Sequence, residues 1–198
     1  MMIFWRTGLA ILAVPKTGSE TLQDALWPHA DIGIRSPPTL RHMNRSTFGR
    51  HWAAGLPETA QGQLETLAVV REPVDWLASW YRYRTRGDVA GTSVSTRGVS
   101  FAQFVEAWLR DRPPDYARVG RQSRFCAGPD GRPAVDHVFA YERPATLHSF
   151  LKARLGIAVA PARRNVSPRA DTPLPDALRQ RLYNEAGAEF ALHARARR

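Results

Sequence analysis

Cysteine, metal-ligand clusters and long apolar runs are all scarce in this chain. A single cysteine, Cys126, excludes an internal disulfide framework, and the six histidines form no cluster at metal-ligand spacing. No apolar run approaches the roughly 20 residues that a membrane span requires. Arg6 interrupts the apolar N-terminal segment, which we expect to be a first strand and not a signal peptide. These absences favour a soluble protein of the reducing cytoplasm.

Lysine is scarce as well, so arginine carries almost all of the positive charge. Lys16 and Lys152 are the only lysines among 28 basic residues, and the net charge is +10. This excess predicts attraction to anions without naming which. No recognised nucleic-acid-binding module accompanies it, so nucleic acid is a disfavoured partner. Part of the charge lies in the tail at 193–198, which we expect to be disordered and solvated.

Apolar runs alternate with segments of helical periodicity along the chain. The runs at 9–14, 66–70 and 136–141 are short and bounded by polar residues, as is typical of buried strands. The alternation predicts an α/β fold with a central parallel sheet flanked by helices on both faces. A chain of this length favours one domain over 1–198. The expected helices are 19–26, 46–64, 74–84, 101–109, 145–155 and 176–192, and the expected loops are 35–42, 85–98 and 166–175.

The segment PKTGSETL (15–22) follows the first of these strands and has the character of an anion-binding loop. Lys16 supplies a mobile positive charge, Gly18 allows close approach of the backbone, and a following helix would point its first N–H groups at an anion. The lysine precedes the glycine, so the loop does not match GxxxxGK[ST]. The alternative is a plain strand-to-helix turn in which Thr17 caps the helix and Lys16 faces water.

The segment REPVDWLASWYRYR (71–84) follows the second strand. Arg71 stands at the strand's end, Pro73 suits the first turn of a helix, and Ser79 lies eight residues after the arginine. A guanidinium and a hydroxyl in this relation suit a second phosphate. The alternative is an amphipathic helix whose tryptophans pack on the sheet, which leaves Arg71 unexplained. The ends of parallel strands share one edge of a sheet, so we expect the two segments to be neighbours.

Together, these two segments resemble the sulfotransferase family that uses 3′-phosphoadenosine-5′-phosphosulfate (PAPS), and the bacterial branch akin to carbohydrate sulfotransferases in particular. The resemblance extends to YERPATLHSFLKARLGI (141–157) and RNVSPR (164–169), and it is weakest over 85–131. It implies a P-loop-like sulfotransferase architecture, PAPS as sulfuryl donor without a metal, and a hydroxyl or amine acceptor on a glycan or glycolipid. The acceptor pocket would be shaped by 85–131.

The resemblance also implies roles for particular residues. The first loop would hold the 5′-phosphosulfate, and the arginine and serine at spacing eight would hold the 3′-phosphate. The first group comprises Lys16, Thr17, Gly18, Ser19 and Thr21, and the second comprises Arg71 and Ser79. Three residues of the late segment either close over the 3′-phosphate or are ordinary loop residues: Asn165, Ser167 and the basic residue Arg169.

Sulfuryl transfer requires charge neutralisation at the leaving oxygen and a base for the acceptor proton. Lys16 fits the first role. His42 fits the second, because an imidazole with a pKa of about 6.5 is mostly neutral at pH 7; related bacterial sequences carry a histidine at this place. His51 and Glu20 are the other candidate bases, and a helix-capping or surface role for His42 stays open. Gln122, Ser123 and Arg124 are either ordinary loop residues or face the ligands, and Cys126 is expected to be a small, partly buried side chain.

Glu20 is unusual in a loop that binds an anion, where the family has a hydroxyl residue. Thr17 and Glu20 also form the T-x-x-E pattern of a capping box, which would compete with the anion for the Thr17 hydroxyl. We expect Glu20 to turn aside, to brace the turn or to approach the acceptor. Its presence keeps open a catalytically weak or inactive protein that binds anions or nucleic acid. A P-loop-type nucleotide kinase is the other alternative, opposed by the glycine-lysine order.

Overall fold

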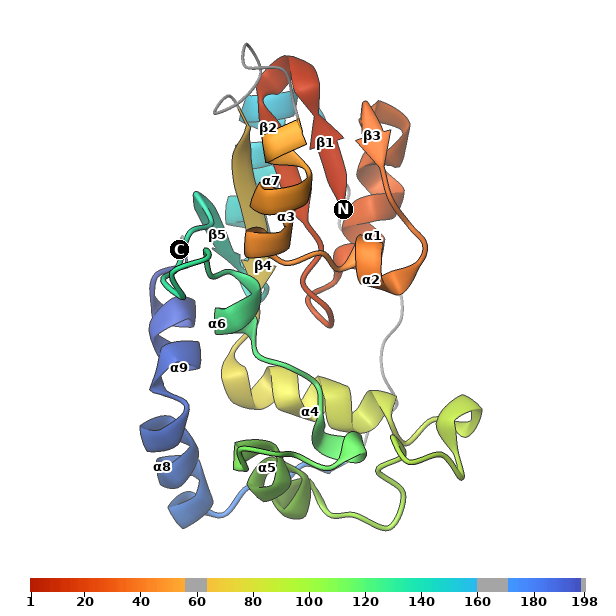
Figure 1. Cartoon of the computed structure of the whole chain (residues 1–198), viewed down its shortest axis with the longest axis vertical. Coiled ribbons are helices and arrows are strands. Elements are labelled where there is room, and N and C mark those ends of the chain that lie inside the picture. Colours follow the sequence, from red (N-terminus) through yellow and green to blue (C-terminus); the bar gives the residue numbers. More distant parts are fainter. Residues whose placement is uncertain (56–63, 160–170, 197–198) are drawn as a thin grey trace.

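The sheet at the centre of the protein is mixed, and its three parallel strands occupy one side of it. The computed structural model describes residues 1–55, 64–159 and 171–196. The five strands lie in the order β3-β1-β2-β4-β5, with β2, β4 and β5 parallel and β1 antiparallel to both β2 and β3 (Figure 1). Their bounds are Met2–Phe4 (β1), Leu9–Leu12 (β2), Ile32–Gly33 (β3), Glu65–Val70 (β4) and His137–Ala140 (β5).

The expectation of a parallel sheet was therefore wrong for the N-terminal segment. A 3-10 turn at Trp5–Thr7 and Gly8, whose φ of 62° lies in the left-handed region, reverse the chain, and Phe4 pairs with Leu9. The segment thus forms a hairpin of two strands instead of one. The three parallel strands are those that the apolar runs predicted.

Helices cover both faces of the sheet, as predicted. Side chains alternate along each strand: Leu67 and Val69 pack on one face, where α1 (Ser19–Leu26) and α7 (Pro144–Leu155) lie, and Ala68 and Val70 pack on the other. The second face is covered by α3 (Arg45–His51), α6 (Gln122–Phe125) and α9 (Gly187–Ala194). Figure 1 shows α3 in front of the sheet and α7 behind it.

A further helical layer lies beyond the carboxyl ends of the parallel strands. It consists of α4 (Pro73–Tyr83), α5 (Phe101–Leu109) and α8 (Asp176–Glu185), seen below the sheet in Figure 1. The apolar face of α4, including Trp76 and Leu77, packs against α5 and α8. The expectation that its tryptophans pack on the sheet was therefore wrong. This packing fixes α4 directly under the strand ends, where the site is expected.

Most helix bounds agree with the periodicity, and the exceptions have local causes. The 176–192 segment is broken at Ala186, whose backbone is not helical (φ −115°, ψ 31°), and α9 takes in two residues assigned to the tail, with Ala196 still buried. The short helix α2 (Pro38–Arg41) lies within the expected loop 35–42. The expectation of one helix over 46–64 was wrong in the described part: α3 ends at His51, and a 3-10 helix, Ala53–Gly55, follows it. Residues 56–63 of that expected helix lie outside the described ranges. Within the described ranges, no helix has the length and apolarity to cross a membrane.

Candidate functional site

The segments that follow β2, β4 and β5 meet at one edge of the sheet. Arg71 Nη1 lies 3.4 Å from the carbonyl oxygen of Lys16, and the indole N–H of Trp76 donates to the carbonyl of Pro15 at 2.9 Å. The Arg71 guanidinium stacks 4.6 Å above the ring of Tyr141, the first residue after β5. The two segments predicted to be neighbours are therefore in contact.

The lysine loop has an unusual backbone. Lys16 (φ 67°) and Gly18 (φ 74°) both occupy the left-handed region, which non-glycine residues rarely adopt. Gly18 is the N-cap of α1, and in the described part of the chain no side chain caps this helix. The first-turn amides of α1 therefore have no partner from a cap, which is the arrangement that suits an anion.

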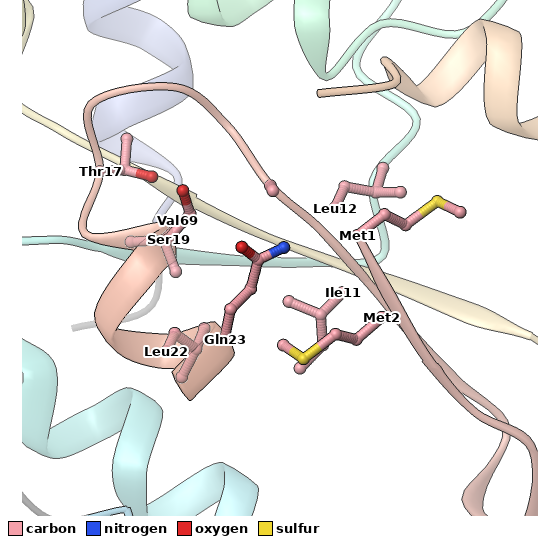
Figure 2. Close-up of a pocket in the computed structure, with 10 residues that line it drawn as sticks. Met1, Met2, Ile11, Leu12, Thr17, Ser19, Leu22, Gln23 and Val69 are labelled. Carbon is pink, nitrogen blue, oxygen red and sulfur yellow. The ribbon is translucent and has the colours of Figure 1, made fainter. Parts of the chain in front are cut away.

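The capping box, the competing reading of Thr17 and Glu20, does not form. Thr17 precedes the N-cap, is only 4% exposed, and donates its hydroxyl to the carbonyl of Val14 at 2.9 Å. The helix begins at Ser19, one residue later than a Thr17 cap would require. Figure 2 shows Thr17 and Ser19 at one end of a small, mostly apolar pocket between α1 and the sheet, with Gln23 the other polar residue that lines it. A hydroxyl engaged in this way is not free to donate to a phosphate.

Lys16 lies against the aromatic face of α4. Its Nζ is 4.2 Å from the ring centroid of Tyr83 and 5.9 Å from that of Trp80. Burial is the main cause that lowers the pKa of Lys16 to about 8, and the charges of Arg71, Arg86 and Arg82 add to it. The alternative in which Lys16 simply faces water does not describe this structure.

Arg71 is held from several directions. Its Nε donates to Asp75 Oδ2 at 2.6 Å, its backbone bonds to Gln122, and its side chain is only 14% exposed. Asp75 also lies 3.7 Å from Arg82. Ser79 is buried one helical turn beyond Asp75 on the same face of α4. The guanidinium is thus fixed close to the lysine loop, with Ser79 along the same face.

His42 contacts the chain just before the lysine loop, whereas Arg71 contacts the carbonyl of Lys16 within it. Its Nδ1 lies 2.7 Å from the carbonyl oxygen of Ala13. A carbonyl only accepts, so Nδ1 carries the proton and the neutral ring presents Nε2 as an acceptor. Burial, with the positive charge of Arg41 as a smaller cause, lowers the pKa of His42 below its usual range. His51, at the end of α3, is exposed to solvent.

Glu20 turns aside from the loop, as expected, and its partner is an arginine. Its Oε1 lies 3.3 Å from Arg41 Nη2, so the ion pair joins α1 to α2. The carboxylate also acts on both Lys16 and His42, raising the pKa of each against the larger effect of burial. Glu20 therefore lies within electrostatic reach of the two residues predicted to act in catalysis, and the capping-box role is excluded because Gly18, and not Thr17, is the N-cap of α1.

Ser19 and Thr21 lie in the first turn of α1, where the uncapped amides are. Gln122 and Ser123, expected in a polar turn, begin α6 and take part in a buried hydrogen-bond network. Cys126 is completely buried, and burial raises its pKa to about 12, so it is an inert core residue. The other late candidates, Asn165, Ser167 and Arg169, lie outside the described residues.

Tyr141 is a site residue that the sequence did not predict. A Cβ built on Gly18 would lie 3.0 Å from Tyr141 Cε2, so the ring closes against the glycine backbone. The available signal was its position, immediately after the third parallel strand, where ligand-binding residues concentrate. Tyr83, which the lysine contacts, gave no signal beyond an aromatic on an amphipathic helix.

Gly18→Ala should lower the free energy of unfolding by about 2–3 kcal/mol, because the new methyl group meets both backbone strain and the Tyr141 ring. Gly91→Ala is the matched control: Gly91 has a similar φ of 77° but no atom within 4 Å of its Cβ position. It should cost about 1 kcal/mol. Urea unfolding of both variants measures the difference, and equal losses would show that the Tyr141 contact is unimportant.

Compared with protein-family models, with curated proteins and with solved structures, the chain gives no match. The arrangement of Lys16, Arg71 and His42 and the sequence resemblance are the observations that bear on its function.

Proposed function

We propose that this protein is a sulfotransferase that transfers the sulfuryl group of PAPS to a hydroxyl or amine of a glycan or glycolipid acceptor. The observation that carries the proposal is the contact between the two cationic segments, with Arg71 Nη1 3.4 Å from the Lys16 carbonyl oxygen. The donor carries two separate anionic groups. A site for it therefore requires two positively charged residues near the same edge of the sheet. A P-loop-like sulfotransferase architecture belongs to the same proposal.

The residues present fit the proposed donor. The left-handed backbone at Lys16 and Gly18, together with the uncapped start of α1, suits the 5′-phosphosulfate, with Ser19 and Thr21 nearby as hydroxyl donors. Arg71 and Ser79 would hold the 3′-phosphate. Thr17 would contribute only its backbone, since its hydroxyl is bonded to Val14. The donor, when bound, supplies an activated sulfuryl group whose bond to the phosphate oxygen breaks as a bond to the acceptor oxygen or nitrogen forms.

His42 has the protonation state that the acceptor side requires. Nδ1–H is committed to the Ala13 carbonyl, so Nε2 is the atom that receives the acceptor's proton. Lys16 neutralises the negative charge that grows on the leaving oxygen. Glu20 balances the charge of Arg41, the neighbour of His42 in the chain. In this scheme Glu20 supports the base and does not oppose the donor.

Two measurements test the proposal. Adenosine 3′,5′-bisphosphate should raise the melting temperature, and labelled PAPS incubated with fractionated host glycans and lipids should transfer its label. If neither PAPS nor the bisphosphate shifts the melting temperature, the proposal fails. A larger shift with ATP and Mg²⁺ would indicate a kinase, and bisphosphate binding without transfer to any fraction would indicate the non-catalytic alternative.

The pH dependence of kcat/KM should be bell-shaped. The acid limb reports His42, which must be neutral to accept a proton; its lowered pKa means activity is retained to a pH below the usual histidine range. The alkaline limb reports Lys16, which must be charged, so activity should fall as the pH rises through about 8. His42→Gln should reduce kcat about 100-fold or more and abolish the acid limb. A residual acid limb in this variant would assign it to another group.

A further inference from the structure

A buried glutamine brackets the backbone of Arg71. Gln122 is only 1% exposed. Its Oε1 accepts from the Arg71 N–H at 2.8 Å, and its Nε2 donates to the Arg71 carbonyl at 2.8 Å. Arg71 is the first residue beyond β4 and no longer has the pairing of the strand. The primary amide of Gln122 therefore satisfies both backbone groups of this one residue.

Gln122 is in turn held by a buried carboxylate from the C-terminal helix α9. Glu189 is 2% exposed and accepts from the backbone N–H of Gln122 at 2.9 Å and of Ser123 at 3.2 Å. The Ser123 hydroxyl donates to it as well. Burial raises the pKa of Glu189, and these donors oppose the rise. A buried carboxylate is costly, and only such donors make it tolerable.

The two ends of Arg71 are thus fixed by different parts of the chain. Asp75 and Tyr141 hold the guanidinium, at 2.6 Å and 4.6 Å respectively, while Gln122 holds the backbone from which the side chain projects. We infer that Gln122, secured by Glu189, is a positioning residue that sets Arg71 for the 3′-phosphate of the donor nucleotide. This inference rests on the proposed function, since it takes the 3′-phosphate as the ligand of Arg71.

The test measures the ratio of the affinity for adenosine 3′,5′-bisphosphate to the affinity for adenosine 5′-phosphate. A general loss of stability does not change this ratio. Dissociation constants for adenosine 3′,5′-bisphosphate and adenosine 5′-phosphate are measured by calorimetry at fixed ionic strength, well below the melting temperature of each variant. Gln122→Met keeps the length of the side chain and removes both hydrogen bonds. This variant should bind the bisphosphate about tenfold more weakly, while its affinity for the monophosphate should change less than twofold.

Two controls isolate the effect. Ser123→Ala removes a hydrogen bond to Glu189 but leaves both bonds between Gln122 and Arg71, so its ratio should equal that of the wild type. In the double variant Arg71→Ala/Gln122→Met, the second substitution should cause no further loss. If Gln122→Met does not fold, Gln122→Asn takes its place: it keeps the amide but is one methylene too short to reach Arg71, and it should lower the ratio in the same way.

The outcomes separate this inference from the proposed function. If Arg71→Ala leaves the ratio unchanged, the assignment of Arg71 to the 3′-phosphate fails. If Arg71→Ala collapses the ratio while Gln122→Met, or Gln122→Asn in its place, keeps the wild-type ratio, the positioning role alone is overturned. A further loss in the double variant would also overturn it, because Gln122 would then act without Arg71.

Discussion

Replacing Arg71 by alanine should weaken the binding of adenosine 3′,5′-bisphosphate about 100-fold and leave the affinity for adenosine 5′-phosphate nearly unchanged. A guanidinium that meets a phosphate through charge-assisted, paired hydrogen bonds contributes about 2–3 kcal/mol, which corresponds to this factor. Arg71 is well placed for such a contact, because its side chain is already ordered by Asp75 and Tyr141. Calorimetric titration at constant ionic strength measures the effect.

The loss should come from the missing ligand contact and not from unfolding. After the substitution, Asp75 still has Arg82 at 3.7 Å and is 44% exposed, so it is neither stranded nor strongly desolvated. The cost in stability from the lost ion pair should be about 1 kcal/mol or less. Arg71→Lys should recover only part of the affinity, since an ammonium lacks the planar fork.

Arg82→Ala is the matched control for charge. It removes the same formal charge from the same helix and the same carboxylate partner, but Arg82 is not bonded to the lysine loop in the way that Arg71 is. It should weaken the bisphosphate by about threefold at most. If Arg82→Ala were as damaging as Arg71→Ala, binding would reflect general attraction to a basic surface, as the non-catalytic alternative predicts.

The parallel part of the fold was predictable because its signals are local. Three apolar runs bounded by polar residues became β2, β4 and β5, and the rule that parallel strand ends share an edge predicted the contact between Arg71 and Lys16. The strand β1 was not predictable in the same way. It has three residues, too few to display a period, and it exists because Gly8 turns it back to pair with β2.

The candidate site was predictable at its cationic points and not at their supports. The local pattern T-x-x-E suggested a capping box, but Lys16 and Gly18 are both in the left-handed region and the N-cap is Gly18, one residue after Thr17. Gln122 bonds to Arg71, which lies 51 residues away in the chain, and Glu189 bonds to Gln122, which lies 67 residues away. Such contacts depend on the packing of α9 against α6, which no periodicity in one segment reveals.

Replacing Lys16 by alanine should lower kcat for sulfuryl transfer about 1000-fold while weakening adenosine 3′,5′-bisphosphate by less than about tenfold. In the proposed mechanism, charge on the leaving oxygen develops mainly in the transition state, so a group that neutralises it affects kcat more than affinity. The half-buried position of Lys16 strengthens its interaction with such a charge, because the same desolvation that lowers its pKa to about 8 reduces screening by water.

Lys152 provides a direct control, because it is the only other lysine in the chain and is exposed on α7. Lys152→Ala should leave kcat and its pH profile unchanged.

Lys16→Ala should in addition lose the alkaline limb near pH 8 in whatever activity remains, since no amine of lowered pKa is left at this position. Retention of that limb would assign it to a different group, and near-normal kcat would exclude Lys16 as the residue that neutralises the leaving oxygen. Loss of kcat together with an equal loss of bisphosphate affinity would make Lys16 a ground-state ligand, because it would then contribute equally before and during the transfer.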